Sequence, residues 1–220
     1  MNPRTDFSIQ SILGGYDKNF TYIVTCSQSR GQVLIDAALS LEKLEPFLHN
    51  DPIAILITHT HSDHIAYLDE YLDAFSNITI LGHPNSENYF SSNTFHPLED
   101  EQKFNIGKLS FHAIHTPGHF HDSICYKLDP VLFTGDTLFV GRTGRVLSSK
   151  SDINKLYDSV YNKILTLPGY LRIFPGHDYG QEPTITLENN IVISPLLKAE
   201  NFDDFTKAMA LYEKNRTPES

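Results

Sequence analysis

The sequence has little of what marks several special classes of protein. Its 220 residues include no tryptophan and only two cysteines, Cys26 and Cys125, while 12 glycines and 12 prolines are scattered along the chain. This composition excludes a disulfide scaffold, a collagen-like chain and a disordered chain. Because 40% of the residues are hydrophobic, a chain of this length can bury one sizeable core.

Basic residues and long apolar runs are also scarce. The chain has 17 lysines and arginines against 27 acidic residues, a formal charge of -10, which disfavours an electrostatic hold on nucleic acid or on an anionic membrane. No apolar run approaches the length that crosses a bilayer, and the start has no basic stretch followed by an apolar core. We expect a cytoplasmic protein with a small-molecule partner, no nucleic acid and no membrane contact, and with its oligomeric state open.

The predicted strands come in runs that are broken by helices. Phe20 to Cys26 and Gln32 to Asp36 are typical of adjacent antiparallel strands, and Ile53 to Ile57 is typical of a strand buried on both faces. The spacing of apolar residues predicts a helix over Ser151 to Leu167, with Ser151 as its N-terminal cap. Because strands and helices do not alternate strictly, we expect two packed sheets covered by helices.

Eleven histidines are present, and several of them are clustered. His59, His61, Asp63 and His64 follow the predicted buried strand within six residues. An extended backbone turns alternate side chains to the same side, so His59 and His61 can chelate one cation. Asp63 and His64 lie where a helix is predicted to begin, so they point in another direction and can bind a second cation close by.

Three further segments repeat one arrangement, in which an apolar strand ends in glycine and then a potential ligand. They contain His119, Asp136 and His177, each preceded directly by glycine. Strand ends of a packed sheet project to one rim, where glycine allows a close backbone approach. Imidazole and carboxylate ligands favour zinc, with manganese or iron as alternatives. Seven ligands exceed the need of one open site, so we expect two metal ions per chain.

The same motifs carry a family resemblance. The strings THTHSDH, TPGH, FTGDTLF and PGHDYG, in this order and spacing, resemble the metallo-β-lactamase-fold hydrolases and, within them, glyoxalase II (hydroxyacylglutathione hydrolase). The resemblance implies an α/β (α+β) fold, a four-layer αββα sandwich, with residues 1–180 as the catalytic domain and residues 181–220 as a short C-terminal loop and helical appendage. It also implies a dinuclear site with three ligands on each metal and one bridging carboxylate. The implied ligands are His59, His61 and His119 on one metal, Asp63, His64 and His177 on the other, and Asp136 between them.

A second family is also similar. The stretch LYDSVYNKILTLP, followed by a strand and HDYG, resembles the persulfide dioxygenases. These share the fold but bind one iron, through positions that correspond to His59, His119 and Asp136. Ligand identity does not separate the two families.

The function that we favour from these residues is hydrolysis of a hydroxyacylglutathione-like thioester by a metal-bound hydroxide, with Asp63 and Asp136 as the catalytic carboxylates. Metal coordination lowers the pKa of water from 15.7 to about 7, and a thiolate with a pKa near 8.5 leaves with little help. Arg145 and Tyr179 flank the predicted site and are the candidate substrate-binding residues. The alternatives are a mononuclear iron persulfide dioxygenase and a non-catalytic metal-binding module.

Overall fold

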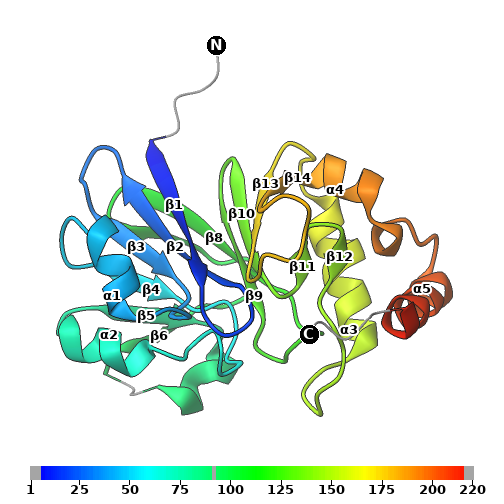
Figure 1. Cartoon of the computed structure of the whole chain (residues 1–220), viewed down its shortest axis with the longest axis horizontal. Coiled ribbons are helices and arrows are strands. Elements are labelled where there is room, and N and C mark those ends of the chain that lie inside the picture. The colour runs from blue at the N-terminus through cyan, green and yellow to red at the C-terminus, as the bar shows by residue number, and fades with distance from the viewer. Residues whose placement is uncertain (1–5, 91–92, 216–220) are drawn as a thin grey trace.

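Two six-stranded sheets packed face to face form the centre of the molecule (Figure 1). The computed structural model describes residues 6–90 and 93–215. Helices lie on the outer face of each sheet, so the layers run helix, sheet, sheet, helix. The predicted α/β sandwich of four layers is confirmed.

The first sheet has the strand order β1-β2-β3-β4-β5-β6. Its first two pairings are antiparallel, and the pairings from β3 to β6 are parallel. The predicted adjacent strands are β2 and β3, and the predicted buried strand is β4. The bounds are β1 (Phe7–Gly14), β2 (Asn19–Cys26), β3 (Gln32–Ile35), β4 (Ala54–Leu56), β5 (Thr79–Gly82) and β6 (Phe95–Pro97).

The second sheet has the strand order β14-β13-β10-β9-β8-β7. Only the β10–β13 pairing is parallel. A two-stranded ribbon of β11 (Leu138–Phe139) and β12 (Arg142–Thr143) lies beside it. The bounds are β7 (Lys103–Ile106), β8 (Leu109–His115), β9 (Ile124–Leu128), β10 (Val131–Gly135), β13 (Arg172–Pro175) and β14 (Ile185–Thr186).

Alternation along the strands distributes apolar side chains among three cores. In β4, Leu56 joins the core between the sheets, whereas Ile55 packs under the helices that cover the first sheet. In β10, Phe133 joins the central core and Leu132 packs under the helices of the second sheet. Successive strand residues point to opposite faces, so strands that are buried on both sides read as continuous apolar runs.

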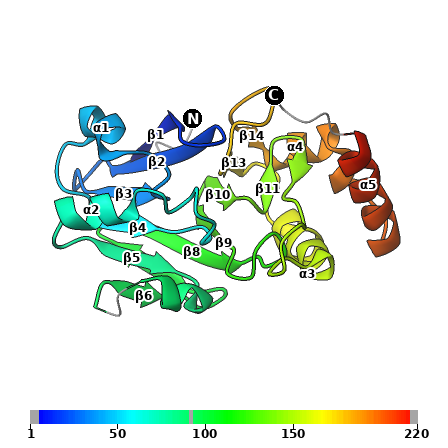
Figure 2. The same ribbon diagram turned by 60° about the horizontal axis from the view of Figure 1, so that its bottom comes forward.

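The helices cover the sandwich from two sides (Figures 1 and 2). Those on the first sheet are α1 (Leu41–Leu44), α2 (Leu68–Ala74) and the 3-10 turns at Glu45–Phe47 and Pro84–Tyr89. Those on the second sheet are α3 (Ile153–Tyr157), α4 (Leu187–Ile193), α5 (Phe202–Asn215), the π-helical segment Asp158–Lys163 and the 3-10 turns at Ile164–Thr166 and Pro195–Leu197. None of the helices in the described ranges is long and apolar enough to cross a membrane.

The helix predicted over Ser151 to Leu167 forms, but with a different cap. Asp152 is the N-cap, and its Oδ1 accepts hydrogen bonds from the backbone of Asn154 at 2.8 Å and of Lys155 at 3.2 Å. The Ser151 hydroxyl donates instead to the Ser148 carbonyl at 2.6 Å. The prediction of Ser151 as the cap was therefore wrong by one residue, because Ser and Asp are both good caps and the sequence placed them side by side.

A histidine pair outside the predicted site, in which His83 is buried and His115 half-buried, makes stability depend on pH. The rings of His83 and His115 stack at 3.6 Å. Burial, followed by the neighbouring His115, lowers the pKa of His83 from 6.5 to about 4, and burial also lowers the pKa of His115. The folded protein therefore favours the neutral rings. Their contribution to stability is complete above pH 6.5 and is lost as the pH falls toward 4.

We expect His83→Asn to lose less stability than the wild type between pH 6.5 and 4, because asparagine cannot be protonated yet can still accept the backbone hydrogen bond from Asn85. Urea unfolding midpoints at a series of pH values measure this. His49→Asn, at an exposed position, is the matched control and should follow the wild type. Identical pH slopes for His83→Asn and the wild type would contradict the assignment.

Candidate metal centre

The loop after β4 carries four of the predicted ligands, and the buried carboxylate of Asp36 determines its shape. Asp36 Oδ1 accepts from the Thr58 backbone at 2.7 Å, and Oδ2 accepts from the Thr58 hydroxyl at 2.8 Å. Oδ2 also lies 2.8 Å from His64 Nδ1. Asp36 thus ties the first residue of the loop to the last, and the chain between them presents the His59 and His61 rings on one side.

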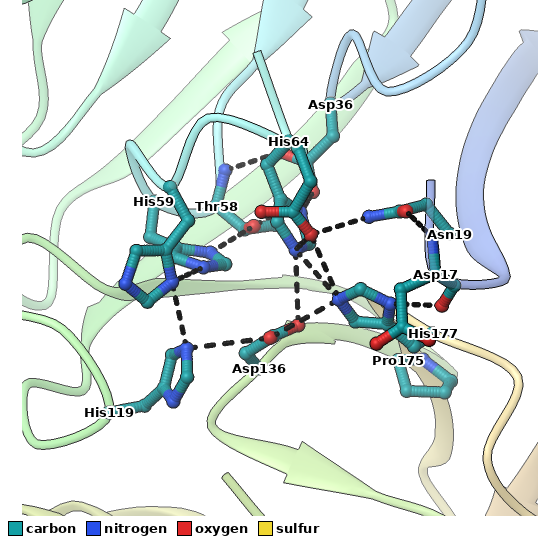
Figure 3. Close-up of polar contacts among 12 residues, drawn as sticks. Asp17, Asn19, Asp36, Thr58, His59, His64, His119, Asp136, Pro175 and His177 are labelled. Carbon is teal, nitrogen blue, oxygen red and sulfur yellow. Dashed lines mark hydrogen bonds and ion pairs between the residues drawn. The ribbon is translucent and has the colours of Figure 1, made fainter. Parts of the chain in front are cut away.

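Three other strand ends bring the remaining ligands to the same rim. His119 follows β8, Asp136 directly follows β10 and His177 follows β13. Figure 3 shows these three side chains converging with His59 and His64. The close approach needs glycine at position 176, because a Cβ there would lie 2.3 Å from Asp136 Oδ1 and 2.6 Å from His64 Cε1.

The first group of ligands consists of His59, His61, His119 and Asp136. The Nδ1 atom of His61 lies 2.9 Å from His59 Nε2 and 3.0 Å from His119 Nε2. The Asp136 Oδ2 atom lies 3.4 Å from His119 Nε2. Three nitrogens and one carboxylate oxygen therefore face a common point.

The second group consists of Asp63, His64 and His177. The Nε2 atoms of His64 and His177 lie 3.2 Å apart, and Asp63 Oδ2 lies 3.3 Å from the latter. Asp136 reaches this group too, since its Oδ1 lies 3.2 Å from His64 Nε2 and its Oδ2 lies 3.3 Å from His177 Nε2. The structure places Asp136 between the two groups, in the position that a bridging ligand needs.

The outer nitrogens of three histidine rings have hydrogen-bond acceptors, which leaves the inner nitrogens available for a metal. The acceptors are the Asp36 carboxylate for His64, the Arg145 carbonyl for His119 at 2.8 Å and the Asp17 carbonyl for His177 at 2.7 Å. Each outer Nδ1 donates a proton, so the inner Nε2 presents a lone pair whenever the ring is neutral. Metal-binding histidines in proteins are oriented in this way.

The spacing of the inner nitrogens fits a cation of the size of zinc. Two ligands at about 2.05 Å from a tetrahedral ion lie roughly 3.3 Å apart, and the nitrogen pairs here are separated by 2.9 to 3.2 Å. Unprotonated nitrogens at such distances repel each other unless a cation or a shared proton lies between them. The histidines and aspartates form a metal-binding site.

Burial and charge divide the seven side chains into neutral and charged groups. Burial lowers the pKa values of His59 and His119, and it lowers that of His61 to about 4. Burial opposes charge on His64 and His177 as well, but Asp136 outweighs it, so the pKa of His64 is raised and that of His177 reaches about 9. The second group therefore releases protons when a cation binds.

The two carboxylates of the site stay ionised. Burial alone would raise the pKa of Asp136, but the charges of His177 and His64 outweigh it and hold that pKa well below its ordinary value. For Asp63 the opposing influence is the hydrogen bond with His177, followed by the charge of His64, and its pKa is lowered too. Ionised carboxylates beside neutral imidazoles are the ligand states that a divalent cation requires.

A cleft of about 170 Å³ opens over the metal ligands, and both predicted substrate-binding residues line it. Each of them already has an acidic partner. Arg145 forms a two-pronged ion pair with Glu213, with Nε 2.9 Å from Oε1 and Nη2 2.7 Å from Oε2. The Tyr179 hydroxyl donates a short hydrogen bond to Asp17 Oδ2, and its ring stacks on His177 at 4.8 Å.

Asp17 in the β1–β2 turn and Asn19, the first residue of β2, contribute to the site without being predicted. Asp17 accepts from His177 and Tyr179. The buried Asn19 donates from Nδ2 to Asp63 Oδ2 at 2.9 Å. Asp and Asn are ordinary turn residues, so nothing in the local sequence distinguishes them. The bridge between Asn19 and His177 and the hydrogen bond from the Asp178 backbone to the Lys18 carbonyl at 2.9 Å hold this segment beside the metal ligands.

Comparison with known proteins places the chain among proteins of similar sequence and structure. The family described as the metallo-beta-lactamase superfamily matches residues 14–177. The probable polyketide biosynthesis zinc-dependent hydrolase BaeB of Bacillus velezensis is 28% identical over 85% of this chain and 86% of its own length. ETHE1 from Myxococcus xanthus has a TM-score of 0.82 and 26% identity, covering 96% of this chain and 92% of its own.

A further relative is more similar over a shorter stretch. The hydroxyacylglutathione hydrolase of Francisella tularensis subsp. novicida is 39% identical over 131 residues, which are 57% of this chain and 49% of that protein. The match therefore spans about half the length of this relative. The predicted family resemblance is confirmed.

We expect Asp36→Asn to weaken metal binding by about 10- to 100-fold while the protein still folds, because the amide cannot accept from Thr58 and His64 together as the carboxylate does. The loss should fall mainly on the group that contains His64. Chelator competition measures the affinity, and circular dichroism checks the fold. Asp69→Asn, a substitution on the exposed side of α2, is the control, and an equal effect from both variants would contradict the role of Asp36.

Proposed function

Because the chain belongs to the metallo-β-lactamase superfamily, we propose that it is a metal-dependent hydrolase that cleaves thioesters of the hydroxyacylglutathione type. The observation that carries this proposal is the pair of ligand groups joined by Asp136 beneath an open cleft. The ligands are those proposed from the sequence: His59, His61 and His119, then Asp63, His64 and His177, with Asp136 shared. The hydroxyacylglutathione hydrolase relative supports the substrate class.

We propose zinc as the native metal, with two ions per chain. The Bacillus velezensis relative is by name a zinc-dependent hydrolase, and nitrogen with carboxylate oxygen suits zinc, with iron or manganese as alternatives. When bound, the ions supply an activated water and a Lewis acid for the carbonyl oxygen.

The protein contributes charge and orientation to this reaction. The ionised Asp136 faces both ligand groups, and Asn19 orients Asp63 within the second group. These carboxylates are the residues that we propose as catalytic. The thiolate that leaves has a pKa of about 8.5, so the reaction needs no strong general acid to protonate it. Arg145 and Tyr179 border the part of the cleft that would receive the thiol arm.

The second candidate is a mononuclear iron persulfide dioxygenase. The first ligand group alone offers His59, His119 and Asp136, the two imidazoles and one carboxylate of an open iron site. A non-catalytic binding module is the third, and the presence of all seven ligand side chains in two connected groups counts against it. For each candidate we propose a small-molecule partner and a cytoplasmic location.

Metal content and the reacting substrate together distinguish these candidates. Protein purified without added metal should contain about two equivalents by elemental analysis and should release thiol from S-lactoylglutathione. We expect a measurable kcat. We also expect a KM raised by weak binding of the glutathione arm, because Arg145 and Tyr179 already pair with acidic groups. One equivalent of iron, with oxygen uptake on a glutathione persulfide and no thioester cleavage, would replace the hydrolase by the dioxygenase.

We expect Asp136→Ala to reduce thioester hydrolysis by at least about 100-fold and to lower the bound metal, since one carboxylate serves both groups. His112→Ala is the control, because His112 lies on β8 and pairs at 2.9 Å with Glu101, away from the ligands. Its activity should stay close to that of the wild type. Comparable losses in the two variants would show that the site has been misplaced.

A further inference from the structure

We propose that Arg142, held in place by the C-terminal helices, binds an oxyanion on the thiol arm of the substrate. The preferred substrates would then be thioesters whose thiol arm carries a carboxylate or a phosphate. This inference rests on the proposed function for the position of the reacting carbonyl. It assigns the anion-binding role to Arg142, a different arginine from the one that sequence reasoning selected.

The guanidinium of Arg142 has donors to spare. Arginine carries five N–H groups, and within residues 6–90 and 93–215 the Arg142 guanidinium forms one hydrogen bond, from Nη1 to the Tyr212 hydroxyl at 2.6 Å. Among the residues that the structure describes, no carboxylate lies within ion-pair distance of Arg142. Its positive charge and its remaining donors are therefore available to a ligand.

Arg145 lacks this freedom. Both prongs of its guanidinium contact the carboxylate of Glu213 on α5, in the fork geometry that a substrate carboxylate would otherwise use. A substrate anion would have to displace Glu213 from Arg145, whereas at Arg142 it displaces no acidic side chain. The two arginines line the same cleft. The difference between their partners therefore determines which guanidinium is available to bind a substrate anion.

Arg142 stands at a short distance from the metal ligands. Its guanidinium lies 3.9 Å from the centre of the Tyr179 ring, which in turn stacks on the His177 ring at 4.8 Å with an interplanar angle of 3°. One aromatic ring thus separates the proposed anion site from a metal ligand. This spacing suits a substrate whose anion is a few bonds away from the thioester carbonyl.

A second and larger pocket adjoins the cleft at Arg142. Its volume is about 540 Å³, and Arg142 and Tyr179 line both cavities. Val140 and Ile193 form apolar parts of its wall, and Gln181 and Tyr212 form polar parts. An anion bound at Arg142 could therefore sit at the junction, with the rest of a longer arm extending into this space.

The turn that carries Arg142 is held from both sides by the C-terminal helices. Asn190 of α4 is fully buried, and its Oδ1 accepts from the Gly141 backbone at 2.7 Å while its Nδ2 donates to the Phe139 carbonyl at 2.9 Å. Tyr212 of α5 holds the guanidinium itself. A binding group that is fixed before the ligand arrives loses less conformational freedom on binding.

Two thioesters of equal length test the proposal: the acetyl thioesters of 3-mercaptopropionate and of 3-mercaptopropionamide. The wild type should prefer the carboxylate by about tenfold or more in kcat/KM, mainly through KM, as expected for a charged hydrogen bond. Arg142→Gln should bring the ratio close to one, and Arg142→Lys should keep part of it. Arg172→Gln, at an exposed arginine whose partner is Thr184, is the control and should keep the full preference.

A binding measurement separates this inference from the proposed function. Calorimetry with 3-(methylthio)propanoate and with its amide, neither of which contains a thioester, should show tighter binding of the carboxylate and loss of that difference in Arg142→Gln. If neither thioester is cleaved but this difference is observed, the thioesterase proposal fails and the anion site stands. If the thioesters are cleaved without a charge preference, or if the preference disappears in Arg145→Gln and persists in Arg142→Gln, the assignment to Arg142 is overturned. Should Arg142→Gln fail to fold, Arg142→Lys and the decline of the wild-type preference with added salt provide the same decision.

Discussion

The carboxylate of Asp136, buried between two groups of imidazole nitrogens, is the constraint on which the arrangement of this protein depends. A charge removed from water is strongly unfavourable unless opposite charges or hydrogen-bond donors surround it. Here His64 and His177 lie within 3.3 Å of its oxygens, and His119 lies 3.4 Å away. The position of this one side chain therefore requires that four separate segments of the chain end at the same place.

The sandwich of two sheets meets this requirement by apolar packing together with buried hydrogen bonds. Side chains in the central core or under the helices anchor strands β4, β10 and β13, and the Tyr22 and Tyr126 hydroxyls donate to carbonyls at the ends of β13 and β4. The polar side chains then follow the strand ends directly, as Asp136 follows β10. A rigid scaffold fixes the points at which the ligand-bearing loops begin.

The wall of the cleft that faces the metal ligands depends on the C-terminal helices. Asn190, Tyr212 and Glu213 each contact the segment from Phe139 to Arg145. This segment also provides the carbonyl that orients His119. Helices α4 and α5 therefore determine which charged groups of this wall remain available to a substrate.

The sequence by itself determined the fold class and the set of side chains that come together in the metal centre. The four strings predicted them because each places its polar residues directly after a buried strand, and strand ends meet at one rim whatever the details of the loops. The sequence did not determine the N-cap of this helix, because Ser151 and Asp152 are adjacent and have nearly equal preferences for the N-cap position. The structure shows Asp152 as the cap. The two-residue strands were missed, because short segments leave a weak periodic signal. The eight-residue edge strand β1 was missed as well.

The partners of the charged residues were decided only by the tertiary structure. Arg145 pairs with Glu213, which is 68 positions away, and the Tyr179 hydroxyl pairs with Asp17, which is 162 positions away. No local pattern encodes such a pairing, because a long side chain can reach any group that packing brings near it. The sequence could therefore identify the metal ligands, because each lies in a motif that follows a predicted strand. Among the residues that the structure describes, Arg142 became recognisable as the cleft arginine without an acidic partner only when the partner of Arg145 was known.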